Sequence, residues 1–160
     1  MTLEPEWESK FEPNSYGFRP GRSSRDAIEA IHHTLRGTKT GKFVLDADIS
    51  KCFDKIDHDK LLTKIDTFPQ LRNQIKSWLR AGVFEKGAYS PTSAGTPQGG
   101  VISPLLSNIA LHGMETHLKE WVVTQEILSQ NGVKLSPASK RASLSVIRYA
   151  DDFVDTKINT

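Results

Sequence analysis

The sequence predicts an α/β fold of the α+β kind, in which short strands and helices are mixed along the chain. Residues 43–49 alternate between two faces, with Phe43 on one face and Asp48 on the other. A second alternating segment runs from Leu144 to Tyr149, and a return strand is expected at Phe153-Val154. Apolar residues at helical spacing occupy much of the sequence between these strands. These patterns predict an antiparallel sheet packed by helices, which are expected to lie on one face.

Capping residues mark where the predicted helices begin. Ser23, followed by Asp26, is typical of a capping box. Asp57 is expected to cap a short helix, and Pro69 to begin another. Ser103, followed by a proline, predicts the start of a long helix. The expected buried side of that long helix comprises Leu105, Ile109, Met114, Leu118, Trp121 and Val122.

Two stretches are predicted to lack long regular elements. Residues 83–100 are rich in glycine, serine and proline, which favours a hairpin or a loop. Residues 124–143 are polar and contain Asn131-Gly132, so an exposed insertion is expected there.

The composition is that of an ordinary globular protein. The chain has 160 residues, 37% of them hydrophobic and 25% charged, which allows one domain with a sizeable core. No apolar run is long enough to span a bilayer and no signal peptide is visible, so no membrane partner is expected. The single cysteine, Cys52, excludes an intramolecular disulfide and fits a cytoplasmic location.

Basic residues are concentrated in the first part of the chain, although the net charge is only +2. Such a stretch can meet phosphates, or it can be a solvated charged face, and composition alone leaves both possibilities open. The residues concerned are Arg19, Arg22, Arg25, Arg36, Lys39 and Lys42.

Carboxylates at the ends of predicted strands are the strongest chemical signal. Asp151 and Asp152 follow an apolar strand, where two like charges repel each other unless water or a cation is near. Asp48 lies on another largely apolar strand, the one predicted at residues 43–49. Hard carboxylate oxygens are the ligands that Mg²⁺ prefers, and two such ions can serve an in-line phosphoryl displacement. The alternative for each aspartate is an ordinary turn or cap.

The segment from Gly95 to Pro104 is the third signal. Its glycines permit close approach of the backbone to a ligand, and Gln98 offers both a donor and an acceptor. Taken by itself, the segment is more typical of a plain loop before a helix.

These segments, in this order, resemble the palm motifs of reverse transcriptases. The three motifs are Asp48-Ile49-Ser50-Lys51-Cys52-Phe53-Asp54, Pro97-Gln98-Gly99-Gly100 and Tyr149-Ala150-Asp151-Asp152. Three more segments, residues 16–23, 53–58 and 103–109, resemble those of bacterial group II intron enzymes. The similarity runs from Leu3 to Val154, nearly the whole chain. The chain is thus similar to the fingers-to-palm part of a group II intron-encoded reverse transcriptase, or maturase.

The resemblance implies a catalytic centre with two Mg²⁺ ions, for which Mn²⁺ is a possible substitute. Asp48 and Asp151 match carboxylates that hold the metals directly. Asp152 matches one that supports the metals and orients the primer end. The main-chain carbonyl of Ile49 matches a further metal ligand.

Other residues match positions that contact substrates. Phe53 matches the aromatic residue that excludes a ribose 2′-OH, although a plain core phenylalanine is the alternative. Gln98 and Gly99 match residues at the incoming nucleotide, and Gly100 one that lets the nucleic-acid strand lie close. Arg19 and Arg22 are expected either to contact the template or to be structural.

The resemblance implies an RNA-directed DNA polymerase that acts on an RNA template, a DNA primer and deoxynucleoside triphosphates, with intron RNA as a further partner. It implies a partial reverse transcriptase domain over residues 1–160. Residues 1–42 would form the end of the fingers and the entry to the palm, and residues 43–160 would form a palm truncated after the Asp pair. The family's thumb is expected to be missing, so weak metal binding and little activity are expected of this chain alone. An inactive remnant, an RNA-binding module, and a retron, diversity-generating or CRISPR-associated reverse transcriptase are the alternatives.

Overall fold

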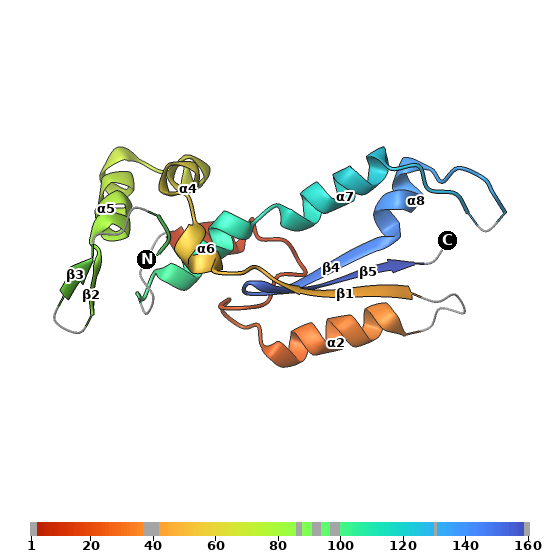
Figure 1. Ribbon diagram of the computed structural model, residues 1–160, viewed down its shortest axis with the longest axis horizontal. Coiled ribbons are helices and arrows are strands. Elements are labelled where there is room, and N and C mark those ends of the chain that lie inside the picture. Colours follow the sequence, from red (N-terminus) through yellow and green to blue (C-terminus); the bar gives the residue numbers. More distant parts are fainter. Residues whose placement is uncertain are drawn as a thin grey trace. The chain divides into compact units, whose positions relative to one another are not determined.

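A computed structural model describes residues 3–36, 42–85, 88–90, 94–96, 100–129 and 131–158 (Figure 1). Its elements are α1 (Leu3–Glu8), α2 (Ser24–Leu35), β1 (Lys42–Asp48), α3 (Cys52–Lys55), α4 (His58–Ile65), α5 (Pro69–Arg80), β2 (Val83–Glu85), β3 (Ala88–Ser90), α6 (Ser103–Leu111), α7 (Met114–Thr124), α8 (Pro137–Ala142), β4 (Leu144–Tyr149) and β5 (Asp152–Ile158). None of the described helices is long and apolar enough to cross a bilayer.

Contacts within the chain divide it into two compact units. The first unit comprises Met1–Trp7 and Ile49–Leu111, and the second comprises Glu8–Asp48 and His112–Thr160. The second unit holds the three aspartates that the motifs single out.

A three-stranded antiparallel sheet forms the centre of the second unit. Its strand order is β1-β5-β4, so the last strand in sequence lies between the other two. The strands predicted at residues 43–49 and 144–149, and the return strand after the Asp pair, are confirmed. The antiparallel sheet packed by helices is confirmed as well.

Helices cover both faces of this sheet, whereas the sequence led us to expect them on one face. Figure 1 shows α2 on one side of the sheet and α7 with α8 on the other. Val146 of β4 packs with Val122 of α7, while the next residue, Ile147, lies against α2 beside Ile31. Because successive residues of a strand point to opposite faces, these contacts require two covering layers.

The predicted capping box begins α2. The Ser23 hydroxyl accepts a hydrogen bond from the Asp26 amide at 3.4 Å, and the Ser23 amide donates to the Asp26 carboxylate at 2.7 Å. Each side chain therefore satisfies a backbone donor that the first helical turn leaves unpaired.

The single long helix predicted after Ser103 is wrong, because two helices, α6 and α7, occupy this stretch. Gly113 lies between them with φ of 91°, a left-handed conformation that a continuous right-handed helix cannot contain. The break also shifts the helical phase. In α7 the core side consists of Met114, Leu118 and Val122, spaced four residues apart, and Trp121 is 60% exposed instead of buried.

The insertion predicted at residues 124–143 is only partly exposed. Ile127 is 7% exposed and joins the core cluster, and Leu135 packs against that cluster. A bridge between Leu128 and Lys134 holds the two sides of the loop together, and α8 follows with Ser136 as its N-cap. The apolar residues on either side of the turn therefore attach this segment to the sheet.

The first unit has its own apolar core. Leu62 of α4, Ile75 and Leu79 of α5, and Ile109 of α6 are almost fully buried. Asp57 caps α4 as predicted, accepting a hydrogen bond from the Lys60 amide at 2.9 Å. The hairpin predicted within residues 83–100 is confirmed as the pair β2 and β3.

Candidate active site

Two predicted catalytic residues face each other across neighbouring strands. Asp48, the last residue of β1, is paired in register with Asp152, the first residue of β5. The two aspartates are 104 positions apart in the sequence (152 minus 48). Both are exposed at the end of the strand pair. Directly opposed residues have Cβ atoms roughly 4.5–5.5 Å apart, so the two carboxylates share one small volume.

Asp151 lies in the tight turn between β4 and β5. Tyr149 pairs with Asp152, so only Ala150 and Asp151 form the loop of this hairpin. Ala150 has φ of 58°, a left-handed conformation that costs a residue with a side chain roughly 1–2 kcal/mol. Such strain persists only where the surroundings enforce it, which is typical of functional sites.

The electrostatic environment of Asp152 is strongly negative. Its pKa is raised above the ordinary value, first by desolvation and then by the negative charges of Asp151, Asp48 and Asp46. Among the residues that the structure describes, no lysine or arginine forms an ion pair with any of these four aspartates. Uncompensated like charges of this kind favour binding of a cation.

The donor set suits a hard divalent cation. Mg²⁺ takes oxygen ligands and is commonly bound by one or two carboxylates together with substrate phosphates. Within the described ranges, no group of three or more His, Cys, Asp or Glu side chains is already arranged as a metal site. The carboxylates at this sheet end therefore fit an ion whose coordination shell is completed by substrate oxygens.

The carbonyl of Ile49 is partly engaged. It accepts a hydrogen bond from the Cys52 amide at 3.0 Å, where the chain turns into α3. Lys51 makes this turn with φ of 55°. A carbonyl oxygen has two lone pairs, so this bond leaves one for a further ligand.

Phe53 lies half-buried in α3, beside the segment that leads to the Pro97–Gly100 motif. The Thr96 amide donates to the Phe53 carbonyl at 2.7 Å. Gly95 has φ of 85°, and a Cβ there would lie 2.5 Å from the same carbonyl oxygen. The structure thus joins the predicted aromatic residue to the start of the glycine-rich motif. The predicted nucleotide contacts Gln98 and Gly99 lie outside the described residues.

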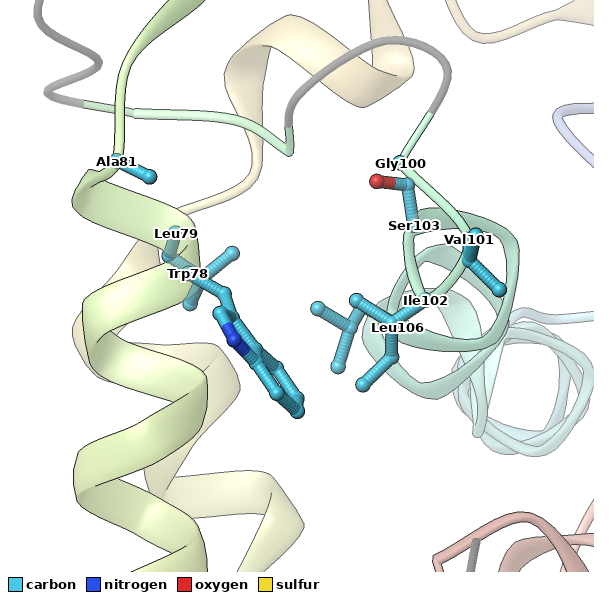
Figure 2. Close-up of a pocket in the computed structure, with 8 residues that line it drawn as sticks. All are labelled: Trp78, Leu79, Ala81, Gly100, Val101, Ile102, Ser103 and Leu106. Atoms are coloured by element: carbon cyan, nitrogen blue, oxygen red, sulfur yellow. The ribbon is translucent and has the colours of Figure 1, made fainter.

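Gly100 lines an apolar cavity of about 320 Å³ in the first unit (Figure 2). Figure 2 shows the Trp78 ring on one wall and Ile102 and Leu106 on the other. The Gly100 carbonyl accepts a hydrogen bond from the Ser103 amide at 3.0 Å, which fixes the entry into α6. Val101, next to it, is 95% exposed. The cavity's apolar lining fits an apolar or flat aromatic group better than a phosphate.

Arg19 is buried and held by acceptors of the second unit. Its guanidinium makes a bidentate contact with Glu8, at 3.1 and 2.8 Å, and donates to the carbonyls of Glu12 and Ser15. These contacts agree with a structural role for Arg19, which was one of the two roles expected from the sequence. A contact with the template stays a prediction. Arg22 donates to the Pro13 carbonyl, and its guanidinium lies 5.2 Å from the centre of the Tyr16 ring.

Arg148 also lies near the turn between β4 and β5, although none of the predicted motifs includes it. It occupies an inward-facing position of β4, two residues after Val146, and is only 3% exposed. A charged residue in a run of buried apolar ones signals a group with fixed partners. The sequence therefore contained a sign of its importance but no sign of what it binds.

Comparison with known proteins identifies the family. The family model for reverse transcriptase (RNA-dependent DNA polymerase) matches residues 1–156. Protein YkfC of Escherichia coli is 35% identical over 96% of this chain, and the match covers 45% of that protein. The group II intron-encoded protein LtrA of Lactococcus lactis is 40% identical over 72% of this chain and 19% of its own length. The predicted resemblance to group II intron proteins is confirmed by such relatives.

A solved structure agrees at the level of the fold. Telomerase from Candida albicans, determined with a fragment of telomeric RNA, superposes with a TM-score of 0.61 at 14% identity. The match covers 98% of this chain and 29% of the telomerase chain. The chain spans less than half the length of the curated relatives named above. With its motifs, its sheet and the family match over residues 1–156, the chain belongs to the reverse transcriptase (RNA-dependent DNA polymerase) family.

Proposed function

We propose that this chain forms the catalytic core of an RNA-directed DNA polymerase of the group II intron type. Its substrates would be deoxynucleoside triphosphates, a DNA primer and an RNA template, with intron RNA as a further partner. The observation that carries the proposal is the register of β1 and β5, which sets Asp48 opposite Asp152, the sequence neighbour of Asp151. Family membership and the similarity to LtrA support it.

The proposed reaction is transfer of a nucleotidyl group to the primer. The 3′-oxygen of the primer forms a bond to the α-phosphorus, the bond to the bridging oxygen breaks, and pyrophosphate leaves. The proton of the 3′-hydroxyl passes to solvent. Two divalent ions, when bound, would supply charge stabilisation to the attacking and leaving oxygens. Asp48, Asp151 and the Ile49 carbonyl would hold these ions, while Asp152 would orient the primer end.

Nucleotide selection would involve residues of the first unit. Phe53 would lie beneath the incoming sugar and exclude a 2′-hydroxyl by steric conflict. Gln98 and Gly99 would contact the nucleotide, and Gly100 would let the strand approach closely. The close packing of Gly95 against Phe53 supports joint action of these two segments.

A second candidate is a catalytic part that depends on further segments, or an inactive remnant with RNA affinity. This chain spans 45% of YkfC and 19% of LtrA. Phosphoryl transfer depends on positioning more than on covalent work by the protein, so separated segments would lose most of the rate.

Primer extension tests the proposal. The purified chain and the product of its complete reading frame are assayed on RNA and DNA templates with Mg²⁺. We expect extension by an active form to fall by at least about 100-fold in Asp48→Asn and in Asp151→Asn. Asp46→Asn is the matched control, because Asp46 lies on the same strand and face but is paired with Val154. Extension that survives Asp151→Asn would contradict the proposed centre, whereas RNA binding without extension would favour the second candidate.

A further inference from the structure

A short segment before α2, residues 14–17, lies along the outer edge of β4, next to the turn between β4 and β5. Ser15 and Arg148 form a parallel bridge. The Arg148 amide donates to the Asn14 carbonyl at 2.9 Å, and the Tyr16 amide donates to the Arg148 carbonyl at 2.9 Å. Two main-chain hydrogen bonds therefore attach this segment to the last part of β4 before the turn.

The Arg148 side chain ties the same segment to the turn itself. One terminal nitrogen donates to the Ala150 carbonyl at 2.8 Å, and the other donates to the Ser15 hydroxyl at 2.7 Å. Arg148 is 3% exposed and Ser15 is 1% exposed, so water competes little for these bonds. The guanidinium thus holds the carbonyl of the one turn residue that adopts a left-handed conformation.

Gly17, which belongs to the same segment, packs closely against Ala150 of the turn. A Cβ at this position would lie 2.2 Å from the Ala150 nitrogen and 2.9 Å from its Cα. No side chain fits there, so the backbone of Gly17 approaches the turn as closely as the chain allows. Ala150 is only 6% exposed as a result of its surroundings.

We propose that Ser15, Gly17 and Arg148, together called the turn clamp, are positioning residues that fix the direction of the Asp151 and Asp152 carboxylates. The inference rests on the proposed function, because it assumes that these carboxylates bind metal. A two-residue turn has few bonds of its own, and Ala150 is strained, so the main chain would relax without outside support. Relaxation at Ala150 would rotate the peptide that leads into Asp151. Metal ligands that lose their outer support typically bind metal about 10- to 100-fold more weakly.

The alternative is that the three residues only stabilise the fold, as many buried polar groups do. The two roles differ in what a folded variant retains. A purely structural residue changes the melting temperature and leaves metal affinity unaltered at temperatures where the variant is folded. A positioning residue changes metal affinity under those same conditions.

Mn²⁺ binding by the purified chain separates the roles, measured from paramagnetic broadening of the Asp151 and Asp152 amide signals. We expect Ser15→Ala and Arg148→Lys to weaken Mn²⁺ binding by about 10-fold while the rest of the spectrum stays folded. Ser143→Ala is the matched control. Ser143 is also a buried serine whose hydroxyl makes one hydrogen bond, here donated to the Lys140 carbonyl, but it precedes the opposite end of β4. We expect this control to lower the melting temperature without changing Mn²⁺ affinity.

Unaltered Mn²⁺ affinity in folded Ser15→Ala and Arg148→Lys would overturn the turn clamp alone. Mn²⁺ binding that is unaffected by Asp151→Asn in an otherwise unchanged chain would instead overturn the metal centre, and the turn clamp with it. Gly17→Ala is expected to be the most damaging variant. If it does not fold, hydrogen exchange of the Asp151 amide in Ser15→Ala gives a second measurement. Faster exchange confined to the turn supports the turn clamp, and unchanged exchange contradicts it.

Discussion

One side chain, that of Asp155, lies in surroundings that disfavour its charged form. Asp155 is half-buried on the face of β5 that packs near Val146. Its Oδ1 atom is buried and has no hydrogen-bond partner among the described residues. Its pKa is raised above the ordinary value of 3.8, mainly by desolvation, although the Thr156 backbone and the Lys157 charge act in the opposite direction.

Replacing Asp155 by valine is expected to stabilise the chain by roughly 1–2 kcal/mol, because a buried unsatisfied oxygen is removed. Because the pKa of Asp155 is raised in the folded state, its charge destabilises the fold little below pH 3.8. The destabilisation grows as the pH rises through the folded-state pKa. Urea unfolding should therefore show a larger gain near neutral pH than at about pH 3. Asp155→Asn, which removes only the charge, is the control. A gain of equal size at both pH values would contradict the ionisation argument.

Phe53 is expected to act on the choice of sugar. Phe53→Ala in an active form should raise ribonucleotide incorporation relative to deoxyribonucleotide incorporation by about 10- to 100-fold, because the conflict with the 2′-hydroxyl disappears. The measurement is the ratio of kcat/KM for the two substrates. Phe11→Ala provides a control, since Phe11 is a buried aromatic residue of the second unit. An unchanged ratio would make Phe53 a plain core residue.

At the scale of elements, prediction from sequence succeeded where the deciding interaction was local. The capping box of α2 and the cap of α4 depend on residues within a few positions of one another. The break between α6 and α7 was missed, because a glycine inside an apolar pattern is compatible with either a continuous helix or a left-handed turn.

In the candidate site, too, residues were predicted where the local sequence was sufficient and missed where it was not. The motifs predicted Asp48, Asp151 and Asp152 from their own sequence, and the strand register brings Asp48 and Asp152 together. The partner of Arg148 could not be predicted, because Ser15 is 133 positions away and belongs to an irregular segment. Contacts of that separation depend on the tertiary fold, and no local pattern encodes them.

The capping box gives an element-scale prediction for α2. Ser23→Ala should destabilise the chain by about 1 kcal/mol, because a backbone donor of the first turn loses its acceptor. For a chain of this size the melting temperature should fall by about 2–4 °C. Ser24→Ala is the matched control, since Ser24 is an exposed serine at the first position of the same helix.

The pH dependence of this effect has a definite sign. The pKa of Asp26 is lowered, first by the side-chain hydrogen bond with Ser23 and then by the backbone hydrogen bond. A lowered folded-state pKa contributes stability above the ordinary value of 3.8 that is lost as pH falls through the folded value. The difference between Ser23→Ala and the unaltered chain should therefore shrink in acid, and a constant difference would argue against a reciprocal box.

At the scale of the whole molecule, one edge strand of the described sheet exposes apolar side chains. β1 lies at the edge of its sheet in the described part of the chain, and its Phe43, Val44 and Leu45 are 66%, 51% and 57% exposed. An open, apolar edge strand is a template for pairing with another strand. The purified chain is therefore expected to self-associate as its concentration rises.

A charge on the strand edge should oppose this self-association. Phe43→Lys is expected to increase the monomer fraction, measured by size-exclusion chromatography with light scattering over a range of concentrations. Val133→Lys adds the same charge at a position that is 65% exposed but lies in a loop. If both variants increase the monomer fraction equally, net charge rather than the strand edge controls association.

The central place of β5 also determines when the site can form during synthesis. Within the described sheet, β1 and β4 contact each other only through β5, the last of these three strands to be translated. At roughly 5–20 residues per second, the 104 positions that separate Asp48 from Asp152 take about 5–20 s to translate. Throughout that interval β1 carries Asp48 without a strand to pair with, so the proposed metal centre can form only after β5 has been translated.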